Sequence, residues 1–234
     1  MKLNQILDFK VYPKLTYTLW IFLFLLFLHL GCTSTPDPNE LSQEERTRIS
    51  VSYMKKGKEK FDEIMSNPNH KAEDFDKVIQ LWNEGLRYLP QNTKIRKDLV
   101  ILYFNLGKGY VKRKGLYQAM AAAAKEKKDM VKAQEYQKLA NESEKKALQS
   151  YQQVIFHLNI LLTQRKPYDP QEEMAFLNYL LVSHVYLKQY EEAIKLIDGE
   201  IQSLPDDDPR IERLMDMKET IIEALQKARQ EKME

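Results

Sequence analysis

The chain has 234 residues, enough for one or two domains with a buried core and no need of disulfide bonds. Glycine is scarce (7 residues) and 30% of the residues are charged, which argues against both a glycine-rich α/β enzyme and a disordered chain. The net charge of +2 comes from residues 1–31, so the rest of the chain is neutral and lacks the basic bias of a nucleic-acid-binding protein. The single cysteine, Cys32, excludes an internal disulfide and a zinc site built from several thiolates.

The first 31 residues have the pattern of a secretory signal peptide. Lysines precede an apolar run over residues 15–30, and Gly31 and Cys32 follow that run. The apolar run has 16 residues, fewer than the roughly 20 that span a bilayer as a permanent helix. Polar residues and prolines come next, which predicts a flexible tether over residues 32–42.

Residues 28–32, Leu-His-Leu-Gly-Cys, resemble the lipobox of bacterial lipoproteins, in which the cysteine thiol accepts a diacylglyceryl group and the chain is cut before it. The last two residues match the motif, whereas His29 and Leu30 depart from it. The resemblance implies lipidation of Cys32 and anchoring in the bacterial cell envelope, and Thr33 after it favours the outer membrane. The alternative is an uncleaved anchor in which the cysteine is an ordinary apolar residue.

Apolar residues recur at spacings of three and four beyond residue 41, which predicts α-helices, and no strand-like alternation occurs. Segments rich in proline, asparagine and aspartate separate the helices, and Asp208 with Pro209 begins the last one. We therefore expect an all-α fold, with one helical domain over residues 43–234. The predicted helices cover residues 43–66, 73–88, 93–127, 130–164, 171–187, 190–204 and 209–231.

Residues 75–90 and 190–205 share one pattern: an aromatic residue, a small or β-branched residue three positions later, a large apolar residue after seven, and a proline after fifteen. A weaker third copy includes Ala147. The helices before the two clear copies carry aromatic-x2-aliphatic-small-x2-aromatic at residues 103–110 and 179–186. A small residue at that position lets a partner helix approach closely.

These patterns resemble the tetratricopeptide repeat (TPR) family, whose repeats combine an aromatic-x2-Leu-Gly-x2-Tyr first helix with a second helix carrying Ala-x3-Phe and a terminal proline. The resemblance covers most of residues 43–206 as about three repeats, and it implies a curved α-solenoid with residues 209–231 as a capping helix. Residues 115–141 interrupt the 34-residue period of the family. Their alanine-rich, proline-free sequence favours an inserted antiparallel helical arm, turning near residues 127–129, over a flexible loop.

Motifs of enzymes and metal sites do not occur in the sequence. The histidines of the body, His70, His157 and His184, lie far apart, and there is no His-Glu-x-x-His, Cys-x-x-Cys or Gly-x-Ser-x-Gly. The acidic run at residues 206–208 lacks the ligand spacing of a calcium loop. We therefore expect no enzyme activity, no cofactor and no metal site.

The first helices of TPR arrays line a concave groove, so the resemblance implies a groove that binds partner proteins. Its basic or protonatable members favour a partner segment with acidic residues or a free C-terminal carboxylate. The alternative is that the lysines are merely solvated. The residues placed in the groove are Phe104, Lys108, Lys112, Leu180, His184 and Lys188.

The sequence as a whole predicts a lipid-anchored scaffold or adaptor of the bacterial cell envelope, with roles such as envelope or pilus assembly. Its partners would be other envelope proteins and the membrane, not nucleic acid. Two alternatives stay open: an envelope enzyme or enzyme subunit with a site in the groove, and an uncleaved, membrane-tethered coiled-coil protein. The chemistry of the groove and the fate of Cys32 distinguish them.

Overall fold

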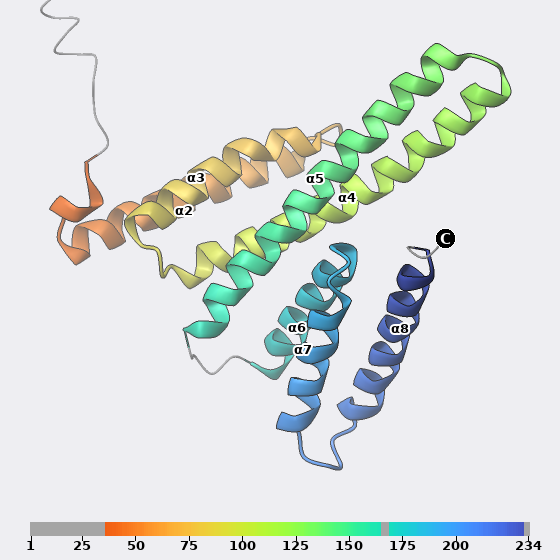
Figure 1. The fold of residues 1–234 in the computed structure, drawn as a ribbon. Helices are drawn as coiled ribbons and strands as arrows, with labels where there is room; N and C mark the ends of the chain where they lie inside the picture. Colours follow the sequence, from red (N-terminus) through yellow and green to blue (C-terminus); the bar gives the residue numbers. More distant parts are fainter. Residues whose placement is uncertain (1–35, 165–168, 232–234) are drawn as a thin grey trace, which may run out of the picture. The chain divides into compact units, whose positions relative to one another are not determined.

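The computed structural model describes residues 36–164 and 169–231, and within these ranges all regular structure is helical (Figure 1). The predicted all-α class is therefore confirmed. The predicted signal peptide and Cys32 lie outside the described residues. The elements are η1 (Pro38–Glu40), α2 (Gln43–Ser66), η2 (Ala72–Phe75), α3 (Asp76–Tyr88), α4 (Thr93–Glu126), α5 (Met130–Thr163), α6 (Pro170–Tyr186), α7 (Tyr190–Ser203) and α8 (Arg210–Gln230).

The chain divides into two compact units, residues 1–43 and residues 44–234. The described part of the first unit contains η1, where the Asp37 side chain accepts a hydrogen bond from the Asn39 amide at 2.9 Å. The second unit contains the rest of the helices. Their ends lie within one residue of the predicted ends, except that η2 precedes α3 where one continuous helix was expected.

Helix N-termini are held by the short polar side chains that the sequence places there. Asn92 accepts a hydrogen bond from the amide of Ile95 at 3.2 Å, and Asp129 accepts one from the amide of Lys132 at 3.1 Å. The predicted cap of the last helix acts in the same way, because Asp208 accepts from the Arg210 amide at 2.9 Å. These caps satisfy amide groups that have no partner within the helix.

The tight turns after α4 and α6 share one backbone device. Lys128 and Lys188 have φ values of 57° and 58°, a left-handed conformation that ends a helix. The following amide in each turn bonds back to a carbonyl five residues earlier, from Asp129 to Ala124 at 2.9 Å and from Gln189 to His184 at 2.8 Å. Each turn therefore reverses the chain in three residues and sets the next helix antiparallel.

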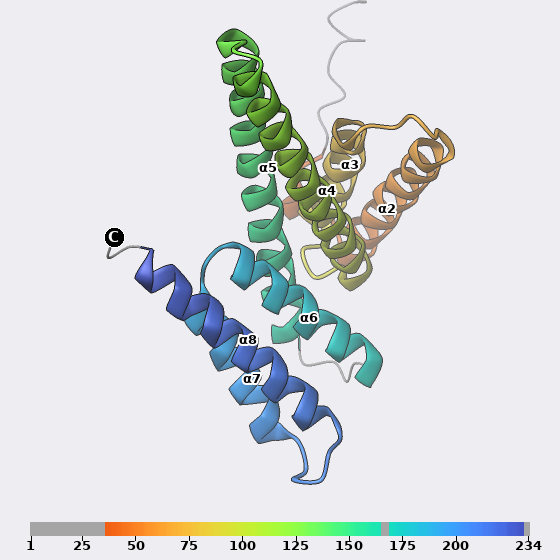
Figure 2. The same ribbon diagram turned by 90° about the vertical axis from the view of Figure 1, so that its right-hand side faces the viewer.

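Three clusters of apolar side chains connect the helices of the second unit. The first joins α2, η2, α3 and α4 with Ala147 of α5, the second joins α4, α5 and α6, and the third joins α6, α7 and α8. Helices α4, α5 and α6 therefore each contribute buried side chains to two clusters. Adjacent helices in sequence also lie side by side, as α4 with α5 and α7 with α8 (Figures 1 and 2).

Two positions of the repeated sequence pattern are buried, those three and seven residues after its first residue. Val78, Ala147 and Ala193, three residues after the first, have no exposed surface, and Trp82, seven residues after it, is 3% exposed. Gly107 meets the Tyr151 ring so closely that an added Cβ would lie 3.0 Å from it. Small side chains are thus required where neighbouring helices approach closely.

Residues 115–141 form the distal ends of α4 and α5, joined by the turn at residues 127–129 (Figure 1). Alanines face the seam between the two helices and are buried, whereas Leu116 and Val131 are exposed on the outside. The small inner side chains allow the two backbones to run close together. The buried alanines are Ala121, Ala124, Ala133 and Ala140.

Two helical glycines provide a matched test of packing. A Cβ at Gly57 would lie 2.2 Å from Nε1 of Trp82, whereas a Cβ at Gly109 would meet nothing within 4 Å. We expect Gly109→Ala to stabilise the protein by about 0.5–1 kcal/mol through helix propensity. We expect Gly57→Ala to destabilise it by about 1–2 kcal/mol because the indole must move. Urea unfolding of both variants measures this; an equal effect at the two positions would contradict it.

Candidate partner-binding groove

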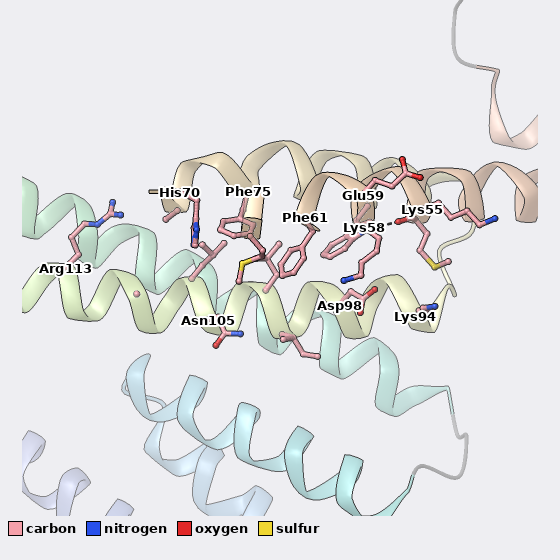
Figure 3. A pocket seen from close by; sticks show the side chains of 18 residues that line it. Lys55, Lys58, Glu59, Phe61, His70, Phe75, Lys94, Asp98, Asn105 and Arg113 are labelled. Atoms are coloured by element: carbon pink, nitrogen blue, oxygen red, sulfur yellow. Dashed lines mark hydrogen bonds between the residues drawn. The ribbon is translucent and has the colours of Figure 1, made fainter. Parts of the chain in front are cut away.

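A groove of about 880 Å³ lies between α2 with its η2–α3 extension and α4 (Figure 3). We call it the α2–α4 groove. Its walls are helices, and its lining is mainly apolar in the middle, with charged side chains toward the ends. The lining residues are Met54, Lys55, Lys58, Glu59, Phe61, Met65, His70, Ala72, Phe75, Trp82, Lys94, Asp98, Ile101, Leu102, Asn105, Leu106, Gly109 and Arg113.

Aromatic rings build one wall of the groove. Phe61 packs against Phe75 and Trp82, with ring centroids 5.6 Å and 6.3 Å apart, and His70 meets Phe75 edge-on at 5.6 Å. The indole of Trp82 donates a hydrogen bond to the Met54 carbonyl at 3.3 Å, so its polar atom is satisfied. The wall therefore presents an apolar surface held in place by its own stacking.

Large apolar side chains remain exposed at the groove. Ile101 on α4 is 46% exposed and Met65 on α2 is 51% exposed. Both belong to the lining, and neither is covered by another described helix. An open apolar groove with flexible methionine at its edge is a surface suited to taking up a side chain of another molecule.

At one end of the groove, two cations share one carboxylate. Arg113 donates a hydrogen bond to Glu73 at 3.0 Å, and Lys146 donates one to the same carboxylate oxygen at 2.9 Å. The Lys146 hydrogen bond is the largest cause that lowers the pKa of Glu73 to about 2, against a smaller opposing effect of burial. Glu73 thus connects η2 with α4 and α5, and its single negative charge is shared between Arg113 and Lys146.

The opposite end carries charges from both walls. Figure 3 shows Lys55 on α2 and Lys94 on α4 at this end of the groove, with Glu59 and Asp98 each one helical turn further along. Burial raises the pKa of the Asp98 carboxyl, and the charges of Lys94 and Lys58 oppose that rise. Lys58 itself pairs with Asp62 at 2.7 Å outside the lining.

The groove residues that the family resemblance predicted do not line the α2–α4 groove. Phe104 (8% exposed) and Leu180 (2%) belong to the second apolar cluster, where the Phe104 ring contacts Tyr179 at 4.5 Å between centroids. This corrects the expectation that these two side chains face an open groove. They are covered because α5 and α6 pack against that side of α4.

The four remaining predicted groove residues lie nearer the surface but do not line the α2–α4 groove. Lys108 and Lys112 are exposed on α4, and the Lys108 ammonium lies 5.6 Å from the Phe104 ring centroid. His184 contacts the Gln189 side chain at 2.8 Å, and Lys188 occupies the left-handed turn after α6.

The groove residues of α2 were missed because the family motifs identify contacts between helices and leave open surfaces unmarked. Exposed apolar residues such as Ile101 carry a weak signal, since they fit the helical period as well as core residues do. The α4 residues that line the groove occur at spacings of three and four, as Lys94, Asp98, Ile101, Asn105 and Gly109. That stripe is visible in the sequence but becomes informative only when α2 is placed opposite it.

A buried histidine lies away from the groove, in the second unit's interior. His157 is 2% exposed, and its Nδ1 accepts a hydrogen bond from the Arg96 guanidinium at 3.1 Å. Arg96 also donates to the Pro90 carbonyl from two nitrogens, at 2.6 and 2.8 Å. Burial, and then the charge of Arg96, lowers the pKa of His157 to about 4, so the imidazole is neutral at pH 7.

Within residues 36–164 and 169–231, no group of three or more histidine, cysteine or acidic side chains is arranged to hold a metal ion. No helix in these same ranges is long and apolar enough to cross a membrane. The Nε2 of His157 is buried without a hydrogen-bond partner; Tyr103 stacks on the imidazole ring, and Phe156 meets it edge-on.

Comparison with known proteins adds no relative: no protein-family model, no curated protein and no solved structure matches the chain.

Proposed function

We propose that this protein is a membrane-anchored interaction scaffold of the bacterial cell envelope and that a partner protein docks in the α2–α4 groove. The observation that carries the proposal is the open groove with an apolar middle, built on a rigid aromatic wall and charged at its ends. Such a surface matches helix-in-groove recognition, in which apolar anchors enter and charges set the register. The groove replaces the surface around Lys108 as the proposed binding site.

The proposed architecture is TPR-like, with α2/α3, α4/α5 and α6/α7 as three helix pairs and α8 as the cap. It is supported by the burial of the pattern positions, with Trp82 and Ile197 equivalent to each other in the first and last pairs. It is also supported by the stepwise sharing of α4 and α6 between apolar clusters, as expected of stacked repeats. The extended α4/α5 pair accounts for the interrupted period.

Docking in the groove is tested with a photoreactive amino acid at position 101 in intact cells. We expect a discrete crosslinked adduct that disappears when Met65→Glu places a charge on the facing wall. The same photoreactive residue at Lys138, exposed on α5, is the matched control. An adduct from position 101 that survives Met65→Glu, or no adduct, would count against the proposal.

The proposed anchor is a lipid on Cys32, supported by the Gly-Cys pair after the apolar run. We expect cells fed an alkyne analogue of palmitate to label the protein, and Cys32→Ala to abolish that label and release the protein from membranes. Because the chain has one cysteine, no second thiol can replace it. If the unmutated protein takes up no label, or if Cys32→Ala is still labelled, the lipid anchor on Cys32 is contradicted.

A further inference from the structure

The walls of the α2–α4 groove restrict the conformation of its occupant. Both walls are helices, whose backbone amides and carbonyls are bonded within their own turns. An extended peptide lying on the apolar middle would therefore find no backbone ladder to pair with, and its own polar groups would be buried unpaired. A helix satisfies its backbone internally, so it can bury one face there without that penalty.

The length of the groove matches a helix of moderate size. Lys94 and Arg113 line it near opposite ends of the α4 wall (Figure 3). Their separation along α4 corresponds to about 28 Å at a rise of 1.5 Å per residue. An occupant of roughly 18 residues would follow the groove from end to end, with its apolar stripe against Phe61 and Ile101.

The charges of the walls follow an order that an occupant can match. On α2, Lys55 precedes Glu59 by one turn, and on α4, Lys94 precedes Asp98 by one turn. None of these four side chains makes an ion pair within the described residues. The two lysines lie at the outer end, and the partly buried Asp98 lies inward of them. Lys58 also lines the inner turn, but its ammonium is paired with Asp62 at 2.7 Å, so Glu59 and Asp98 are the acidic side chains of that turn without an ion pair.

We propose that the groove binds an amphipathic helix of a partner protein that carries an acidic residue at its outer turn, a basic residue one turn further in, and then an apolar stripe. This inference rests on the proposed docking function and specifies the chemistry of the partner. The acidic residue meets Lys55 and Lys94, and the basic residue meets Glu59 and Asp98. At the far end Arg113 is already paired with Glu73, so we assign no charge to the occupant there. Charge order therefore sets the direction and register of docking.

The test uses a phage library of 18-residue amphipathic helices whose stripe varies among Leu, Ile, Met and Phe. The library encodes the acidic-outer order and the basic-outer order in equal numbers. It is selected on the purified full chain in lipid nanodiscs, after depletion on empty nanodiscs. We expect the acidic-outer order to be enriched about tenfold over the reverse, because the reverse order places like charges together on both walls.

Two charge-exchange variants leave the net charge unchanged. They therefore distinguish an effect of charge order from nonspecific electrostatic attraction. In the double variant Lys55→Glu with Glu59→Lys, the charge order on α2 becomes the reverse of that on α4. The preference for acidic-outer peptides should then fall until the two orders are enriched about equally. The same exchange at Lys138 and Glu142, an exposed pair at the same spacing on α5, should leave the preference unchanged. Ile101→Lys should remove selection of both orders.

Enriched peptides without a charge preference, or a preference that persists after the exchange on α2, would overturn the proposal. If those peptides still require Ile101, docking in the groove stands and only the charge order fails. A failure to enrich any peptide above the Ile101→Lys variant overturns helix binding altogether. The crosslinking experiment in cells reports separately on whether a protein docks there.

Discussion

Replacing Trp82 with alanine should destabilise the protein by about 3–5 kcal/mol, the cost of emptying a large buried aromatic site. The indole is 3% exposed, lies directly over Gly57, stacks with Phe61 and donates to the Met54 carbonyl. These contacts join α3 to α2, so the loss should lower the midpoint of urea unfolding followed by circular dichroism. Trp82→Phe keeps an aromatic ring but loses the hydrogen bond, so its stability should lie between those of the natural sequence and Trp82→Ala.

The contact between Trp82 and Gly57 can be isolated with a double-mutant cycle. Gly57→Ala should be unfavourable in the natural sequence, where its Cβ would lie 2.2 Å from the indole nitrogen. In the Trp82→Ala background the obstruction is gone, so the same change should become favourable by about 0.5–1 kcal/mol through helix propensity. Additive effects in the two backgrounds would show that the close approach does not govern the packing of α2 on α3.

The second large effect is a loss of stability on acidification that depends on His157. Its pKa is about 4 in the fold and 6.5 in an unfolded chain, so the unfolded state binds more protons between these values. The stability that the neutral imidazole contributes is complete above pH 6.5 and is lost as the pH falls toward 4, by about 3 kcal/mol in total. Protonation of Nδ1 also removes the acceptor that Arg96 uses.

His157→Asn provides the test, because its amide oxygen can occupy the place of Nδ1 and accept from Arg96 without taking up a proton. The free energy of unfolding of this variant, measured by urea at several pH values, should change by about 3 kcal/mol less between pH 7 and pH 4 than that of the natural sequence. An unchanged pH dependence would show that another group controls acid stability.

Glu73→Gln is the matched control for the pH window. The pKa of Glu73 is about 2 in the fold against 4.5 in an unfolded chain, so its contribution is present above pH 4.5 and is lost as the pH falls toward 2. Its substitution should alter the pH dependence below about 4.5 and leave the interval from 6.5 to 4.5 as it is. Since the Glu73 side chain is 40% exposed, solvent screening limits the effect to about 1 kcal/mol.

The helices and their ends were predictable because their causes are local. Apolar spacing of three and four, together with caps such as Asn92 and Asp129, acts within one or two turns of the chain. The burial of Val78, Ala147 and Ala193 was likewise predictable, since a repeated pattern marks the face on which helices meet. A reading of spacing alone therefore located the helices and much of the core.

The candidate site was not predictable to the same extent. Phe104 and Leu180 fit the family's groove positions but are covered by neighbouring helices, while Ile101, one turn from Phe104, is left open. The apolar period is the same for a covered and an uncovered stripe. Burial of His157 beside Arg96 also joins residues far apart in the sequence, so no local pattern announces it.

The amino-acid sequence by itself determined that residues 36–164 and 169–231 are helical and, apart from the start of α3, where each long helix begins and ends to within one residue, because hydrogen bonding and capping within a helix involve residues a few positions apart. Only the tertiary structure decided which faces are covered. Helix α2 packs through Trp82 and Gly57 so that a groove stays open beside α4, whereas α5 and α6 close over Phe104. That outcome depends on side-chain volumes at contacts between distant segments, which spacing along one helix does not encode.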